Sequence, residues 1–150
     1  MTDDKVSIEV RLPPLPCNGI LKYKGLMRGK DLLTIHSCIN LMQSIYHNYS
    51  MYVDERGLIP FNDPEVVENI KFFKEHATDF YPYVSKKALL NCISLAELIL
   101  TKYNIKTSSG EQVPFPSVCS HKFTAFKDAN GTLRMRIESP YYNGTVSLFD

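Results

Sequence analysis

The stretch from residue 88 to residue 100 constrains the fold more than any other part of the chain. It is apolar except at three positions, which are Asn91, Ser94 and Glu97. On a helix these three side chains form one narrow strip, and the other sides are apolar. A helix of this kind is buried on most of its faces, so it needs other elements on two sides. We therefore expect a central core helix that is capped by Ser85 and ends near Tyr103.

Two more helices are predicted ahead of the central one. Residues 32–49 carry apolar side chains at helical spacing, and Asp31 is the expected N-terminal cap. A second helix is expected to begin at Asp63, where a cap residue is followed by proline and then by a carboxylate in the first turn. It should end near Ala77. These two helices can cover one side of the central helix.

Strands are predicted at both ends of the chain. Residues 6–12 alternate between apolar and polar side chains, which is typical of a strand with one buried face, and residues 20–24 form a weaker second strand. Near the other end, residues 122–126 and 132–138 read as a hairpin around an Asn-Gly turn. A last short hairpin is expected within residues 141–148.

The order of these elements predicts an α+β fold. Strands precede and follow a block of three helices, whereas a parallel α/β sheet requires strands that alternate with helices. We expect the N-terminal and C-terminal strands to form a mostly antiparallel sheet that packs against the three central helices. The 150 residues contain no repeat and no break in composition, so a single domain should span residues 1–150.

Composition limits the class of protein. A hydrophobic content of 44% with 22% charged residues is typical of a soluble globular domain. Two aspartates stand in the first four residues, where a signal peptide would be basic, and no stretch approaches the roughly eighteen apolar residues of a membrane span. We therefore expect a soluble, cytoplasmic protein without a membrane partner.

The four cysteines, Cys17, Cys38, Cys92 and Cys119, include no Cys-x-x-Cys pair. Cys38 and Cys92 fall within predicted helices beside isoleucines, where a thiol packs as a small buried hydrophobic group. Because the expected compartment is reducing, all four cysteines are predicted to be reduced and structural.

The chain contains no motif of catalysis or cofactor binding, such as a glycine-rich nucleotide loop, a nucleophile elbow or a metalloprotease helix. Cys119 and His121 are the best candidates for chemistry, because a thiol and an imidazole can act as nucleophile and base, or as zinc ligands together with Cys17. Paired metal-ligand spacing and an orienting acid are missing. We expect no metal, no cofactor and no enzymatic activity.

A proline-rich run occupies residues 12–16, which read Leu-Pro-Pro-Leu-Pro. Such a run can present a polyproline ridge to an aromatic-lined groove. The basic residue that usually anchors this kind of ligand is displaced by one position. We interpret the run as an extended connector between two strands.

Charge is unevenly distributed although the chain carries a net charge of only +1. Residues 1–30 hold six basic and three acidic side chains, residues 31–80 hold three and eight, and residues 81–150 hold eight and five. The middle segment is therefore acidic, and it would repel a long polyanion.

Four basic residues follow one another without an acidic residue between them: Lys22, Lys24, Arg28 and Lys30. Tyr23 lies between two of them, and Arg134 and Arg136 extend the patch if the terminal strands share one sheet. A basic surface with interleaved aromatic side chains suits single-stranded nucleic acid, which needs phosphate attraction and base stacking. It also suits an acidic protein surface.

These features favour a non-catalytic protein-interaction or assembly subunit. The chain lacks catalytic motifs, its charge is uneven, and it has nine tyrosines, a residue that is enriched at interfaces. The expected partner is another protein, which includes a second copy of the chain. Frequent Ile, Asn, Lys and Tyr are typical of AT-rich coding sequences, so we expect a viral or phage complex.

Two other functions stay open. A nucleic-acid-binding domain that uses the basic, aromatic sheet face is the first alternative. A small enzyme built on Cys119 and His121 is the second.

Overall fold

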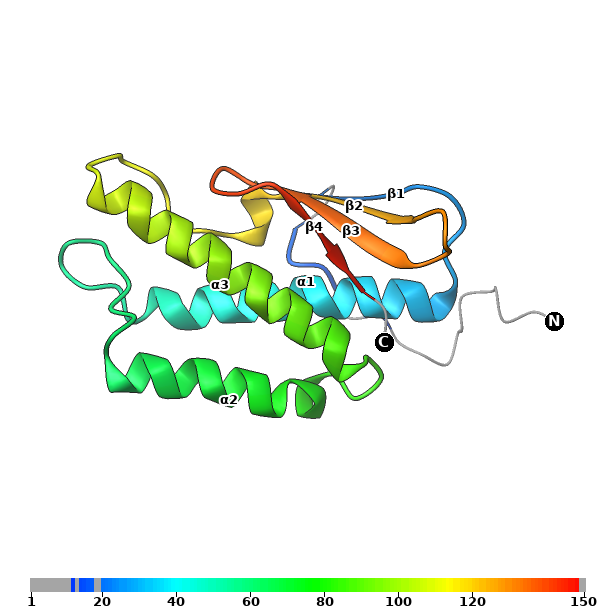
Figure 1. Cartoon of the computed structure of the whole chain (residues 1–150), viewed down its shortest axis with the longest axis horizontal. Coiled ribbons are helices and arrows are strands. Elements are labelled where there is room, and N and C mark those ends of the chain that lie inside the picture. The colour runs from blue at the N-terminus through cyan, green and yellow to red at the C-terminus, as the bar shows by residue number, and fades with distance from the viewer. Residues whose placement is uncertain (1–11, 13, 18–19, 149–150) are drawn as a thin grey trace.

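The computed structural model describes residues 12, 14–17 and 20–148. In that range the chain forms three α-helices, a 3₁₀ turn and four strands in one sheet (Figure 1). In chain order the elements are β1 (Leu21–Tyr23), α1 (Gly29–Ser50), α2 (Pro64–Phe80), α3 (Lys86–Ser108), η1 (Val118–Ser120), β2 (Lys122–Lys127), β3 (Leu133–Glu138) and β4 (Gly144–Ser147). The strand predicted at residues 6–12 lies outside the described residues, apart from Leu12.

The sheet has the strand order β1-β2-β3-β4. β1 runs parallel to β2, with Leu21 opposite Phe123, whereas β2, β3 and β4 are successively antiparallel. The predicted α+β fold, in which strands from both ends of the chain share one sheet, is confirmed. The sheet is mixed rather than mostly antiparallel, because three helices separate β1 from β2 and a connection of that length allows a parallel pair.

The molecule is built in layers, with α1 and α3 between the sheet and α2 (Figure 1). α3 packs against α1, α2 and β4. Its side chains at Ile93, Ile99 and Leu100 are almost completely buried. The prediction of a central core helix with cover on two sides is therefore confirmed.

Two helices begin at their predicted caps. The Asp63 carboxylate accepts a hydrogen bond from the Glu65 backbone N–H at 2.8 Å, and the Ser85 hydroxyl accepts one from the Ala88 N–H at 3.1 Å. Both helices run a few residues beyond their predicted ends. Each cap satisfies a backbone donor that a helix end otherwise leaves without a partner.

The end of α3 is held by the loop that follows α1. The Tyr103 hydroxyl donates to the Gly57 carbonyl at 2.7 Å. The Asn104 side chain accepts from the Ile59 N–H and donates to the Ile59 carbonyl, both at 2.8 Å. These long-range contacts extend α3 past Tyr103, and no local pattern in the sequence predicts them.

The prediction that Asp31 caps α1 is wrong. α1 begins at Gly29, and Arg28 takes the cap position. The Asp31 carboxylate lies in the first turn, where it accepts from the Arg28 N–H at 3.0 Å and pairs with Lys127 at 3.0 Å. A carboxylate in the first turn also interacts favourably with the helix dipole.

The last strand pairs differently from the prediction of a hairpin within residues 141–148. The Ser139 hydroxyl donates to the Tyr142 carbonyl at 2.6 Å, and the Asn143 side chain accepts from the Ser139 N–H at 2.9 Å. This tight turn folds β4 back onto β3, with Val146 opposite Met135.

Candidate basic interface

Register places one set of cations on one face of the sheet. Ala125, Met135 and Val146 lie in register across β2, β3 and β4, and all three are buried toward the helices. Because side chains alternate along a strand, the neighbouring positions point to the opposite face. The central row on that opposite face consists of Lys22, Thr124, Arg136 and Thr145.

Two further rows complete this face. Arg134 stands between Phe126 and Ser147, and Lys122 stands opposite Glu138. Lys24 follows Lys22 by two residues, so alternation gives it the same direction. Its backbone N–H donates to Ala125 at 2.8 Å, which continues the β1–β2 ladder. We call the five cations on this surface the basic sheet face: Lys22, Lys24, Lys122, Arg134 and Arg136.

The spacing of the basic sheet face follows from sheet geometry. Positions two residues apart on one strand are about 6.7 Å apart, and β1 and β3 are separated by about 10 Å, two strand spacings. Four of the five cations therefore form two tracks, one on β1 and one on β3, and Lys122 lies on β2 between them. The hydroxyl of Thr124 and the ring of Phe126 lie between them, on β2.

Carboxylates neutralise this face only in part. At the strand positions of the face, Glu138 is the one acidic side chain, and its oxygen lies 3.9 Å from Arg136 Nε. Asp128, in the β2–β3 turn, lies 3.7 Å from Arg134 Nη1. Both are loose, partly exposed ion pairs, which contribute little binding energy. The face keeps an excess of positive charge that is available to a ligand.

The structure brings together four of the seven predicted site residues, which are Lys22, Lys24, Arg134 and Arg136. Tyr23 points toward the helices, where its hydroxyl lies 3.0 Å from His36 Nε2 on α1. The interleaved aromatic side chain that the sequence suggested is therefore on the other side of the sheet from the lysines that flank it.

Arg28 and Lys30 are also separated from the strand cations, because they lie at the start of α1. There they line a polar hollow together with Asp31 and Lys127. Sequence reasoning missed Lys122 and Phe126 as members of the face. Once Phe123 is recognised as buried, the alternation within residues 122–126 predicts that Lys122 and Phe126 share the opposite face.

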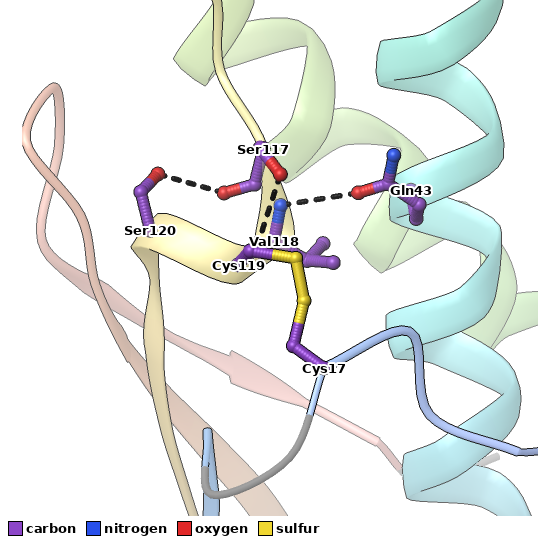
Figure 2. The surroundings of a disulfide bond; sticks show 6 residues. All are labelled: Cys17, Gln43, Ser117, Val118, Cys119 and Ser120. Carbon is purple, nitrogen blue, oxygen red and sulfur yellow. Dashed lines mark hydrogen bonds between the residues drawn. A yellow bond between two sulfur atoms is a disulfide. The ribbon is translucent and has the colours of Figure 1, made fainter.

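Cys119 is joined to Cys17 by a disulfide, with 5.6 Å between the two Cα atoms (Figure 2). The prediction that these two cysteines are reduced is wrong. Ser117 Oγ accepts from the Cys119 N–H at 3.1 Å, and the Val118 N–H donates to Gln43 on α1 at 3.2 Å, which fixes η1 beside the Cys17 segment. A pairing across 102 residues leaves no local signal in the sequence.

Cys38 and Cys92 are free and completely buried, as predicted for small hydrophobic side chains in the helices. The two thiols face each other across α1 and α3, and the hydrogen bond between them raises the pKa of Cys92 well above its usual value, together with burial. A thiol in this state is a poor nucleophile.

His121 does not form a nucleophile–base pair with Cys119. Its ring is buried, and its Nε2 lies 2.9 Å from the Tyr46 hydroxyl on α1. Burial lowers the pKa of His121 to about 4, so the ring is neutral near pH 7. The Cys119 sulfur is held in the disulfide. Within the described residues, no three His, Cys, Asp or Glu side chains gather in a way that could hold a metal ion.

Comparison with known protein families, with curated proteins and with solved structures gives no significant match. In the part of the chain that the structure describes, no helix has both the length and the apolar character to cross a membrane.

Proposed function

We propose that this chain is a non-catalytic interaction subunit that binds an acidic protein surface through its basic sheet face. The observation that supports this proposal most is the set of five cations on three strands, against one carboxylate at the strand positions of the same face. Among the residues that the structure describes, no helix covers this face, because α1 and α3 pack on the other one (Figure 1). Complementary charge raises the association rate and selects the partner.

Several side chains of the face favour carboxylates over nucleic-acid bases. Thr145 offers an exposed hydroxyl donor beside the cations, and the buried Thr124 lies in the same row. Phe126 is half-buried, and Tyr23 is directed toward α1. Single-stranded nucleic acid gains much of its binding energy from stacking on exposed aromatic rings, and this face supplies little such area.

Single-stranded nucleic acid remains a second candidate because of where the acidic residues lie. Half of the acidic side chains of residues 31–80 are on α2: Glu65, Glu68, Glu75 and Asp79. α2 lies on the far side of α1 and α3 from the sheet (Figure 1). Exposed charges separated by more than about 8 Å are largely screened at physiological salt. The acidic segment therefore repels a polyanion on the sheet less than its sequence suggests.

Two probes separate these candidates: a Glu- and Asp-rich peptide and a single-stranded oligothymidylate, each titrated against the full chain at several salt concentrations. We expect the peptide to bind. The double variant Lys22→Ala/Arg136→Ala should weaken binding about tenfold, since two exposed ion pairs together contribute about 1.4 kcal/mol. The control, Lys71→Ala/Lys86→Ala, removes two exposed lysines from α2 and α3 and should leave the affinity unchanged.

Binding of the oligonucleotide in place of the peptide would replace the proposal with the second candidate. In that case the log–log salt slope should lie near −0.7 per phosphate contact, and the Lys22→Ala/Arg136→Ala variant should reduce its magnitude by about 1.4. A chain that binds neither probe, or a control variant that weakens binding equally, would contradict both candidates.

A further inference from the structure

A second surface, on the helical side of the molecule, has the opposite chemistry. α1 and α2 enclose an apolar hollow of about 450 Å³, whose lining is mostly aliphatic and aromatic. Phe72 and Phe80, both on α2, are 48% and 50% exposed there, and their ring centres lie 6.2 Å apart. Exposed aromatic rings that gather beside a hollow are typical of a surface that binds a partner.

A row of carboxylates flanks this hollow. Glu68 lies four residues before Phe72 and Glu75 lies three residues after it, so both stand beside its ring on the same face of α2. Glu65 and Asp79, seven residues before and after Phe72, extend the row in both directions. All four carboxylates are exposed. We call them the acidic ridge, which runs for about 21 Å along α2 at 1.5 Å per residue.

Little positive charge offsets the acidic ridge. In the described part of the chain, Asp79 is the one member that forms an ion pair, with its oxygen 2.9 Å from Nδ1 of His76. Lys74 turns toward α3, where it pairs with a glutamate at 3.4 Å. Lys71 stays exposed, about 100° around the helix from Phe72. Four carboxylates beside one exposed lysine leave the ridge negative, directly next to an apolar surface.

The lining of the hollow favours a helix over an extended segment as its occupant. An extended backbone carries N–H and C=O groups that need partners where water is excluded, and the backbone groups of α1 and α2 are used within the two helices. The polar lining consists of a few side chains, of which Asn48 and Asn69 are hydrogen-bonded to each other. A helix satisfies its own backbone and can pack its side chains between two others. From Asn69 to Phe80 the hollow is about 17 Å long, which is three helical turns.

We propose that the apolar hollow and the acidic ridge together bind a basic, amphipathic helix of a partner protein. Apolar side chains spaced by three or four residues insert beside Phe72 and Phe80, and lysines or arginines on the adjoining side of that helix pair with the ridge. The partner is a different protein, because α1 and α3 use their apolar sides in the core of this chain and α2 is itself acidic. The site is independent of the function proposed for the basic sheet face.

The test titrates the full chain with a synthetic peptide of about fourteen residues, the length that spans the ridge as a helix. Its leucines repeat every third or fourth residue, and its lysines lie on one adjoining side. We expect the peptide to bind, to gain helical circular dichroism, and to shift the nuclear magnetic resonance signals of the Phe72 and Phe80 rings. A peptide of the same composition in scrambled order should bind at least tenfold more weakly, because it has no apolar face.

Two variants of the chain separate the charges from the rings. Glu68→Gln/Glu75→Gln should weaken binding about tenfold, the effect of two exposed ion pairs, and should reduce its dependence on salt. Phe72→Ala/Phe80→Ala should weaken binding at least as much. Circular dichroism checks that both variants keep their helices, and the four substituted positions are exposed. The control, Glu55→Gln/Glu111→Gln, removes the same charge from loops that do not line the hollow and should leave the affinity unchanged.

Several results would overturn the proposal. They are absence of binding, equal binding of the scrambled peptide, full affinity in the Phe72→Ala/Phe80→Ala variant, and equal weakening by the control. If the chain alone sediments as a dimer that Phe72→Ala/Phe80→Ala dissociates, a second copy occupies the hollow instead. The Lys22→Ala/Arg136→Ala variant should bind the basic peptide at least as tightly as the unaltered chain, and a loss of binding in it would place the peptide elsewhere.

Discussion

The basic sheet face and the apolar hollow between α1 and α2 lie on different sides of the molecule and are built by different means. The cations of the sheet come from β1, β2 and β3, and the register of the strands aligns them. The hollow is made by two helices that are consecutive in the sequence, and the rings of Phe72 and Phe80 on α2 line it. One surface carries an excess of charge, which acts at a distance, and the other is mostly apolar, which acts only on contact. The two surfaces therefore differ in their physical chemistry.

The largest expected effect concerns the disulfide, which joins two segments that are distant in the sequence. Cys17 lies ahead of β1, and Cys119 lies in η1, directly ahead of β2. A cross-link that closes a loop of about 100 residues stabilises by about 4–5 kcal/mol in the chain-entropy model. We expect a thiol reductant to lower the free energy of unfolding by about this amount in a denaturant titration. The variant Cys17→Ser/Cys119→Ser serves as the control, because it should show no response to the reductant.

The next effect tests whether both surfaces depend on one core. Ile93 on α3 is 1% exposed, and α3 lies between the sheet and α2 (Figure 1). Ile93→Ala should cost about 3–4 kcal/mol of unfolding free energy, since it removes buried methyl groups and leaves a cavity. Signals from the sheet and from α2 should be lost in one transition. Two separate transitions, or a cost below about 1 kcal/mol, would show that the two sides fold independently.

The third effect is a dependence of the free energy of unfolding on pH. It is caused by His121, which lies between β2 and α1. Burial lowers the pKa of His121 to about 4, whereas the unfolded chain has the usual value of about 6.5. Between these values the unfolded state holds the additional proton, so stability falls as the pH decreases from 6.5 to 4. The loss should approach 3 kcal/mol at pH 4. His121→Gln should remove this part of the dependence, and an unchanged pH profile in that variant would contradict the assignment.

The smallest expected effect concerns the stability of a variant of the basic sheet face. Lys22→Ala/Arg136→Ala should change the free energy of unfolding by less than about 0.5 kcal/mol, because exposed charges on a sheet contribute little to folding. The same variant should bind the acidic peptide about tenfold more weakly. If the double substitution instead destabilised the chain by several kcal/mol, the basic sheet face would be part of the fold rather than a binding surface.

Local patterns in the sequence predict most of the fold. The apolar surface of residues 88–100 predicts the central helix, and the caps Asp63 and Ser85 mark two helix starts correctly. These features depend on side chains within a few residues of each other. The alternation in β3 predicts that Arg134 and Arg136 share one face, opposite Leu133 and the other buried positions.

Features that depend on long-range contacts were not predictable in the same way. Tyr23 sits between two lysines in the sequence, but its hydroxyl meets His36 on α1, because neighbouring residues of a strand face opposite sides. Arg28 and Lys30 look continuous with the lysines, yet they belong to the start of a helix. The Cys17–Cys119 bond joins segments 102 residues apart. In each case the tertiary fold decides which residues become neighbours.

The separation of α2 from the sheet has a consequence for how the molecule moves toward a partner. With a net charge of +1 the chain has almost no monopole, so it experiences little force at long range. Its acidic helix and its basic sheet nevertheless lie at opposite ends of the layered structure, which gives the molecule an electric dipole moment. Within about a Debye length of an acidic surface, the field exerts a torque on this dipole that turns the sheet toward the surface before contact forms. The layered arrangement thus orients the chain during diffusion, independently of how tightly it finally binds.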